Sequence, residues 1–87
     1  MKLEFTGHAL FEMSRRSITN RQVEEVVKNP QQESRSLKGR VILQNRYYDG
    51  IVEKEMILRV IGNRGSDSFK VVTVYKTSKV EKYWMED

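Results

Sequence analysis

The spacing of apolar residues changes at Asn29-Pro30, and this change limits the folds that the chain can adopt. Before it, Val23, Val26 and Val27 recur at helical spacing, whereas after it apolar residues alternate or run together over short segments. Proline also disfavours a helical conformation at the residue that precedes it. The sequence therefore predicts an N-terminal helical part followed by an extended part.

Two helix starts are visible in the N-terminal part. Thr6 is expected to cap a helix over residues 7–16, and Thr19 a helix over residues 20–29, with Gln22 completing a capping box. The link between them is short, so the two helices form a hairpin or an angled pair. The buried stripe of the first helix is expected at Leu10 and Met13, with Ala9 beside them.

The part after Pro30 reads as consecutive strands. Strands are expected at residues 40–48, 54–62 and 69–76, with a last short strand at 80–84, a loop at 31–38, and an edge strand or an extended lead-in at residues 2–5. In the third strand, alternation puts Phe69, Val71, Thr73 and Tyr75 on one face. The prediction is one α+β domain over residues 1–87, with two N-terminal helices packed on a three- to four-stranded antiparallel sheet.

The composition removes several classes of chemistry. The chain of 87 residues has no cysteine and one histidine, which leaves no disulfide, thiolate nucleophile or thiolate ligand. Its carboxylates show no spacing typical of a metal site, so we expect neither a metal nor a cofactor. No apolar run approaches the ~20 residues of a membrane span. We therefore expect a cytoplasmic protein without a membrane partner.

Basic residues and tyrosines occur together in two segments that contain no acid. The net charge is +4, and the two segments are residues 35–48 and 70–79. They contain Arg35, Lys38, Arg40, Arg46, Tyr47 and Tyr48, and Lys70, Tyr75, Lys76 and Lys79, respectively. This mixture is typical of a nucleic-acid surface, where cations contact phosphates and rings stack on bases. The alternative is a solvated basic face on a small protein.

Two residues are candidates for chemistry. His8 is expected in the first turn of the first helix, where it is either a general base or acid or a structural cap. Arg59 stands between Ile57 and Ile61 on one strand face, where it needs an anion or an acidic partner, unless it is exposed with its stem over apolar neighbours. The chemistry left open is metal-free phosphoryl transfer on RNA, in which the 2′-hydroxyl of the substrate is the nucleophile.

A set of residues that runs through most of the chain follows a recognisable pattern: Phe5-Thr6-Gly7-His8-Ala9, Met13, Arg16-Ser17-Ile18-Thr19, Val23, Val26-Val27, Pro30, Leu58-Arg59-Val60, Val72-Thr73-Val74-Tyr75, Lys79 and Tyr83. In these residues the chain resembles a small bacterial and archaeal domain family of uncharacterised function within the RelE/ParE-like toxin superfamily. The chain departs from the family at Glu12, where arginine is usual, and at Ser17, where glycine is usual. Glu12 weakens the basic cluster beside His8.

The resemblance implies a RelE-like, microbial RNase-like fold and a metal-independent endoribonuclease toxin of a type II toxin–antitoxin system. The expected substrate is RNA, free or bound to the ribosome, and the expected protein partner is a cognate antitoxin. The expected catalytic residues are His8, Arg16, Arg59 and Tyr75, and the expected substrate-binding residues are Arg15, Arg40, Arg46, Tyr47, Lys76 and Lys79. The alternatives are a non-catalytic module that binds nucleic acid or a partner protein, and a gyrase-directed toxin.

Overall fold

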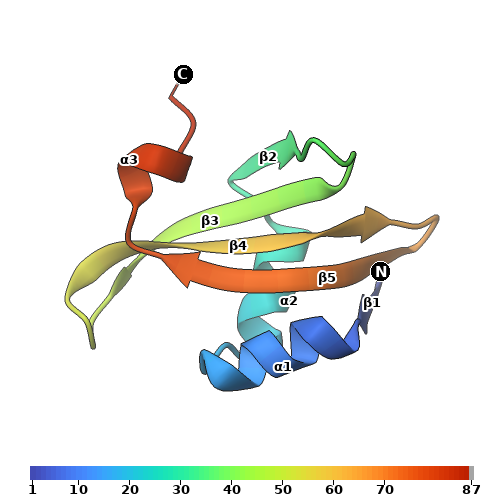
Figure 1. The fold of residues 1–87 in the computed structure, drawn as a ribbon, viewed down its shortest axis with the longest axis horizontal. Helices are drawn as coiled ribbons and strands as arrows, with labels where there is room; N and C mark the ends of the chain where they lie inside the picture. Colours follow the sequence, from blue (N-terminus) through green and yellow to red (C-terminus); the bar gives the residue numbers. More distant parts are fainter. Residues whose placement is uncertain (87) are drawn as a thin grey trace.

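The computed structural model describes residues 1–86, which form one sheet of five strands and three helices (Figure 1). The elements are β1 (Lys2–Phe5), α1 (Gly7–Arg15), α2 (Asn20–Lys28), β2 (Gln32–Arg35), β3 (Val41–Asp49), β4 (Lys54–Arg64), β5 (Ser68–Thr77) and α3 (Val80–Tyr83). The strand order is β1-β5-β4-β3-β2, with β1 parallel to β5 and all other neighbours antiparallel. The α+β class and the two N-terminal helices are confirmed. The antiparallel sheet of three to four strands is wrong, because β1 and β2 extend it at its two edges.

The edge strand β2 lies where the sequence predicts a loop. Its residues Gln32–Arg35 pair antiparallel with residues 41–44 of β3. The segment Gln-Glu-Ser-Arg contains no β-branched or aromatic residue, so its own propensity for a strand is low. Backbone hydrogen bonds to β3 make it a strand, and a pairing of this kind is not visible in local sequence.

The last secondary structure is also different from the prediction. Residues 80–84 do not form a strand, because the chain turns into the short helix α3 after β5. The amide of Trp84 donates to the carbonyl oxygen of Val80 at 2.8 Å, and the amide of Tyr83 donates to that of Lys79 at 3.3 Å. These backbone groups are therefore satisfied within one turn rather than in the sheet.

A β-bulge changes the two faces of β5. The register between β4 and β5 shifts between Ile61 and Gly62, so that Gly62 pairs with Val71 whereas Ile61 pairs with Thr73. An extra residue in one strand reverses the alternation beyond it. Val74, not Thr73, therefore joins Phe69 and Val71 in the core, and the prediction of one continuous face through Tyr75 is wrong.

The core lies between the two N-terminal helices and one face of the sheet (Figure 1). Its helical side chains are Ala9, Met13, Val23, Val26 and Val27, and its strand side chains include Leu43, Leu58, Val60 and Val74. Leu10, expected in this stripe, is 52% exposed, because it lies on the outer side of α1. Burial of this helical stripe, rather than helix propensity, holds these two nine-residue helices in place.

Both predicted helix starts are confirmed. The hydroxyl oxygen of Thr6 accepts from the amide of Ala9 at 3.0 Å, and its O–H donates to the carbonyl oxygen of Val72 at 3.0 Å. Thr19 and Gln22 form the reciprocal capping box. The Thr6 bond to β5 has a further consequence, because it fixes the start of α1 beside the strand that carries Thr73 and Tyr75.

Gly62→Ala is expected to destabilise the protein by about 1–3 kcal/mol, the usual cost of overpacking a closed site. A Cβ at Gly62 would overlap the carbonyl oxygen of Lys70 and lie 2.8 Å from the ring of Phe69. Gly50→Ala is the matched control, because a Cβ at Gly50 meets nothing within 4 Å. Urea unfolding measures both, and equal midpoints for the two variants would contradict the close approach at the bulge.

Candidate functional site

Arg59 lies at the centre of the sheet, on the face opposite the helical core. It is 8% exposed, and its neighbours in register are Gln44 on β3 and Tyr75 on β5. Its Nη1 donates to the hydroxyl of Tyr75 at 2.8 Å. The guanidinium carbon lies 4.4 Å from the ring centroid of Tyr83 and 5.6 Å from that of Tyr75. Arg59 is therefore a buried cation between two aromatic rings.

The positive charge of Arg59 is not neutralised within residues 1–86. None of the ion pairs in this part of the chain includes Arg59, and its Nε–H has no hydrogen-bond partner there. A guanidinium carries five N–H donors. Burying a charge costs several kcal/mol unless it is paired, and a desolvated cation–π contact contributes about 2 kcal/mol. The site is electrostatically incomplete and favours an anion.

Gln44 adds an unused acceptor beside this unused donor. Its side chain is almost fully buried, and its Nε2 donates to the Oε1 of Gln32 at 2.7 Å and to the carbonyl oxygen of Tyr83 at 3.0 Å. Its Oε1 has no donor among the described residues. Gln44 and Arg59 are directly paired across β3 and β4. The site can therefore bind a ligand group that both accepts and donates hydrogen bonds.

The C-terminal segment, residues 79–86, covers this site. The side chain of Gln32 holds the segment through both its atoms: Nε2 donates to the carbonyl oxygen of Met85 at 2.7 Å, and Oε1 accepts from the amide of Met85 at 3.0 Å. No residue of α3 is fully buried. The cover therefore depends on a few polar contacts, on the Tyr83 ring above Arg59 and on the partly buried side chains of Val80 and Trp84.

The two tyrosines beside Arg59 differ in acidity. Burial raises the pKa of the Tyr75 hydroxyl, although the charge of Arg59 opposes this effect. Burial acts on Tyr83 in the same direction, but the charge and hydrogen bond of Lys82, with smaller contributions from Tyr75 and Arg59, lower its pKa overall. The rings meet edge to face at 6.2 Å. Tyr75 is thus the neutral hydroxyl that accepts from Arg59 inside the site.

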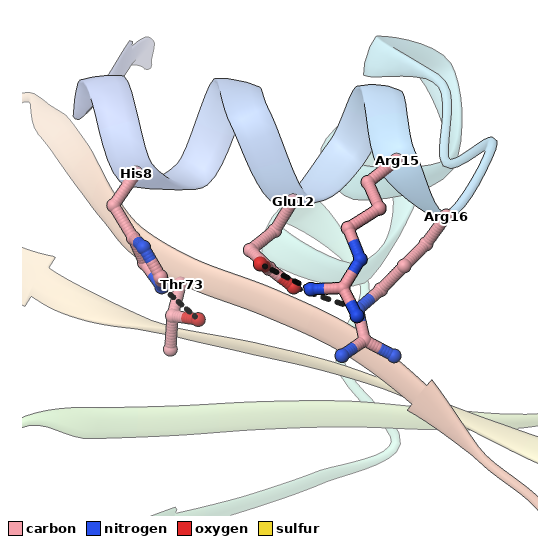
Figure 2. Close-up of polar contacts among 5 residues, drawn as sticks. All are labelled: His8, Glu12, Arg15, Arg16 and Thr73. Atoms are coloured by element: carbon pink, nitrogen blue, oxygen red, sulfur yellow. Dashed lines mark hydrogen bonds and ion pairs between the residues drawn. The ribbon is translucent and has the colours of Figure 1, made fainter.

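A second polar cluster lies on α1, beside β5 (Figure 2). The side chain of His8 is exposed, and its Nε2 lies 3.4 Å from the hydroxyl oxygen of Thr73. One turn further along, Glu12 accepts from the Nε of Arg16 at 2.8 Å and from Nη1 of Arg15 at 3.4 Å. Glu12 therefore pairs with both arginines that the sequence places beside His8, and its single negative charge offsets one of their two positive charges.

The carboxyl of Glu12 is held in its charged form. Its hydrogen bond to Arg16 lowers its pKa, against the opposing effect of burial, and the charges of Arg16, Arg15 and His8 add to the lowering. The side chain is 11% exposed, against 36% for Arg16 and 62% for Arg15. The carboxylate at this position thus anchors two neighbouring cations.

Residues of β5 contact both clusters. Thr73, which contacts His8, and Tyr75, which contacts Arg59, are two residues apart on β5 and project to the same side. At ~3.3 Å per residue, their backbones lie about 7 Å apart. No hydrogen bond or ion pair within residues 1–86 joins His8 or Arg16 to Arg59, so only a ligand lying along β5 would connect them.

The expected substrate-binding residues are scattered. Arg46 pairs with Glu55 of the next strand at 2.7 Å and lies 5.6 Å from the ring of Trp84. Tyr47 packs against the helical core on the other face. Lys76 is paired with Leu58 in register, and Lys79 precedes α3 and is exposed. Arg40 is half-buried before β3, and Arg15 forms an ion pair with Glu12. The structure does not assemble these cations into one surface.

Gln32, Gln44 and Tyr83 belong to the site but were not among the residues chosen from the sequence. Gln44 follows three apolar residues of β3, and a polar residue at such a position could have indicated a buried polar group. Gln32 lies in a segment expected to be a loop. Only the tertiary structure brings the three together, because they come from β2, β3 and α3.

Within residues 1–86 there is no cluster of three or more His, Cys, Asp or Glu side chains that would hold a metal ion. In the same part of the chain, every helix is too short or too polar to cross a membrane. The polar features of the described structure that bear on chemistry are therefore the arginine, tyrosine and histidine groups above.

Glu12→Gln is expected to lower the melting temperature at neutral pH, because it removes the anion that holds Arg15 and Arg16. The folded pKa of Glu12 is lowered, so its contribution is present above the ordinary glutamate pKa of ~4.3 and is lost as pH falls through the folded pKa. The wild type and the variant should therefore converge at acid pH.

Glu24→Gln is the matched control for Glu12→Gln. Glu24 makes an exposed pair with Lys28 at 3.7 Å on α2, and such pairs contribute little. Thermal unfolding followed by circular dichroism at a series of pH values makes the comparison. A constant difference between wild type and Glu12→Gln across the whole acid range would contradict the assigned role of the carboxylate.

Comparison with known proteins identifies a family for most of the chain. Residues 5–76 match the family described as Domain of unknown function (DUF4258). No curated protein and no solved structure matches the chain. The matched range contains His8, Gln44, Arg59 and Tyr75, and it ends before the C-terminal segment that carries Tyr83. The chain belongs to the DUF4258 family.

Proposed function

We propose that the protein is a metal-independent endoribonuclease toxin of the RelE/ParE-like type, neutralised by a cognate antitoxin. RNA is the proposed substrate, and the cytoplasm, where RNA is abundant, is the proposed site of action. The observation that carries the proposal is the buried guanidinium of Arg59, which has an unused Nε–H and no carboxylate partner within residues 1–86. A phosphate supplies both the charge and the acceptors that this group lacks.

Arg59 would stabilise the charge that develops on the phosphorane. A preorganised cation in a site closed to water acts more strongly than the same charge in solvent. Tyr75 would orient the guanidinium through the hydrogen bond to its hydroxyl. The unused Oε1 of Gln44 would accept from the 2′-hydroxyl of a neighbouring nucleotide rather than from the nucleophile, and so would distinguish RNA from DNA.

His8 would be the group that exchanges a proton. It is exposed on the first turn of α1 and approaches β5 at Thr73. An RNA strand lying along β5 would pass Thr73 and Tyr75 in succession, and so would meet His8 and Arg59 together. Arg16 would add a phosphate contact with the donors that Glu12 leaves free, because Glu12 uses only its Nε.

The first prediction of this proposal concerns the C-terminal segment that covers Arg59. Gln32→Ala removes both hydrogen bonds that hold Met85, and two bonds of about 0.5–1.5 kcal/mol each should open the C-terminal segment roughly tenfold more often. Since apparent affinity scales with the open fraction, binding of single-stranded RNA should strengthen by about the same factor. Fluorescence anisotropy at one fixed salt concentration measures it.

Two further variants make this measurement specific. Ser34→Ala alters the same strand two residues away, where the structure shows no hydrogen bond from the Ser34 side chain to the C-terminal segment, and should leave the affinity unchanged. Arg59→Met keeps the volume and removes the charge, so it should abolish the gain when combined with Gln32→Ala. An equal gain in the presence and absence of Arg59 would show that RNA binds elsewhere.

The second prediction concerns cleavage. His8→Gln should keep the fold, because the side chain is exposed, and should slow RNA cleavage in EDTA by ~10²–10⁴-fold, the usual contribution of general acid–base catalysis. Ser14→Ala on the same helix is the control and should cleave like wild type. Unchanged cleavage by folded His8→Gln would exclude His8 as the proton-exchanging group.

A second candidate is a module that binds RNA without cutting it. Two observations favour it: Glu12 pairs with Arg15 and Arg16, and Tyr83 covers Arg59. Both reduce the positive charge that could stabilise a phosphorane during cleavage. Binding that depends on Arg59, together with no cleavage by either wild type or Gln32→Ala, would assign this function instead.

A further inference from the structure

A pocket of about 470 Å³ lies on the helical side of the sheet, between α2 and the strands β3 and β4. Its apolar wall is formed by Val26, Tyr47 and Leu58. Val26 and Leu58 belong to the hydrophobic core, and Tyr47 packs against it. A pocket of this volume is within the range that holds an organic group the size of a side chain or larger. It lies on the opposite side of the sheet from Arg59, so it is a separate site.

The rim of the pocket presents hydrogen-bond donors. The carbonyl oxygens of the rim amides are all engaged within the protein: that of Gln22 accepts from Thr19, that of Gln31 from the amide of Arg46, and that of Asn45 from the amide of Gln31. The Nε2 groups of Gln22 and Gln31 have no acceptor among residues 1–86. The rim can therefore donate to a ligand far better than it can accept from one.

The charged side chains at the rim also differ in whether a partner of opposite charge lies beside them. Arg46 is neutralised by Glu55 at 2.7 Å, whereas Glu25, one turn from Arg21 on α2, accepts only from the uncharged amide of Asn29 at 3.3 Å. Arg21 is exposed and forms no ion pair within residues 1–86. A guanidinium beside free amide donors matches a carboxylate. The neighbouring apolar wall matches an aliphatic or aromatic group.

We propose that this pocket binds one apolar side chain of an acidic partner peptide, with a flanking carboxylate held by Arg21 and the amides of Gln22 and Gln31. A peptide fits better than a small free acid because the two strands that line the pocket lead to a hairpin with further exposed apolar side chains. These are Ile51, at 93%, and Val52, at 50%. The inference does not rest on the proposed ribonuclease activity, since it uses neither His8 nor Arg59.

The test is an NMR titration of the full-length chain, labelled in its methyl and amide groups. The probe is an acetylated hexapeptide with two leucines between pairs of glutamates, and its control is the same peptide with glutamines. The methyl groups of Val26 and Leu58 should shift and saturate. The glutamate peptide should bind about tenfold more tightly than its control, the factor expected for one charge-assisted hydrogen bond.

Charge variants assign the interaction to the rim. Arg21→Gln should reduce the affinity for the glutamate peptide to that for the control peptide, and Glu25→Gln should raise it. Lys38→Gln removes an equal charge from an exposed loop and should have no effect. Equal losses in Arg21→Gln and Lys38→Gln would reduce the binding to general electrostatic attraction and overturn the proposal.

Three other results would also overturn it. The first is saturation of both peptides with equal affinity, or no shift at Val26 and Leu58. The second is a shift of these methyl groups with protein concentration alone, which would make the occupant a second copy of the chain. The third is displacement of the glutamate peptide by single-stranded RNA at the same methyl groups, which would assign the pocket to nucleic acid.

Discussion

Burial of the Arg59 guanidinium is the constraint on which the rest of the described structure depends. Its strand, β4, lies at the centre of the sheet, with β3 and β5 on either side and the helical core against one face. Arg59 projects from the other face, where a cation needs partners. Tyr75, Tyr83 and the polar side chain of Gln44 surround it, and the C-terminal segment closes over it. Gln32 of β2 and Tyr83 of α3 both contribute to this cover.

The charges near α1 show the opposite arrangement. Arg15 and Arg16 would form a cationic patch beside His8, but Glu12 accepts from both and keeps its charge. Within residues 1–86, Arg59 is therefore a cation in the sheet without a carboxylate partner, whereas Arg15 and Arg16 at the end of α1 share one carboxylate. An anion gains more at the first than at the second, because a buried charge is screened less by solvent and salt. This difference is why Arg59 carries the proposed function and Arg16 only adds to it.

The two faces of the sheet have separate potential roles. The face with Arg59 and Gln44 holds two buried polar atoms that have no hydrogen-bond partner within residues 1–86, and the C-terminal segment closes over it through two hydrogen bonds between Gln32 and Met85. The face with the helices is apolar and well packed, except where α2 leaves a pocket beside Tyr47. A substrate on one face and a protein partner on the other would not compete directly for the same atoms. Coupling between them would have to pass through β3 and β4, which contribute to both sites.

Local signals in the sequence predicted the local structure. The caps at Thr6 and Thr19, the apolar stripe of α2 and the strands β3 to β5 each depend on residues a few positions apart, and all are present in the structure. The sequence also identified His8 and Arg59 as the residues whose side chains needed an explanation. The strand β2 was not predicted, because its residues Gln-Glu-Ser-Arg have a low propensity for a strand.

What only the tertiary structure decided involves residues far apart in the chain. The bulge opposite Gly62 put Val74 rather than Thr73 into the core, because the register depends on how β4 and β5 pair over their whole length. The acid that neutralises Arg46 is Glu55 of the next strand. The segment 35–48 around Arg46 contains no acid, so this ion pair could not be predicted from it. Gln32, Gln44 and Tyr83 became neighbours through strand order and the fold of the C-terminal segment. The sequence by itself determined the two N-terminal helices and the central strands, and it left two alternatives for Arg59, a buried cation with a partner or an exposed one. The tertiary structure decided that Arg59 is buried and which groups surround it, because burial and pairing are set by contacts across the chain.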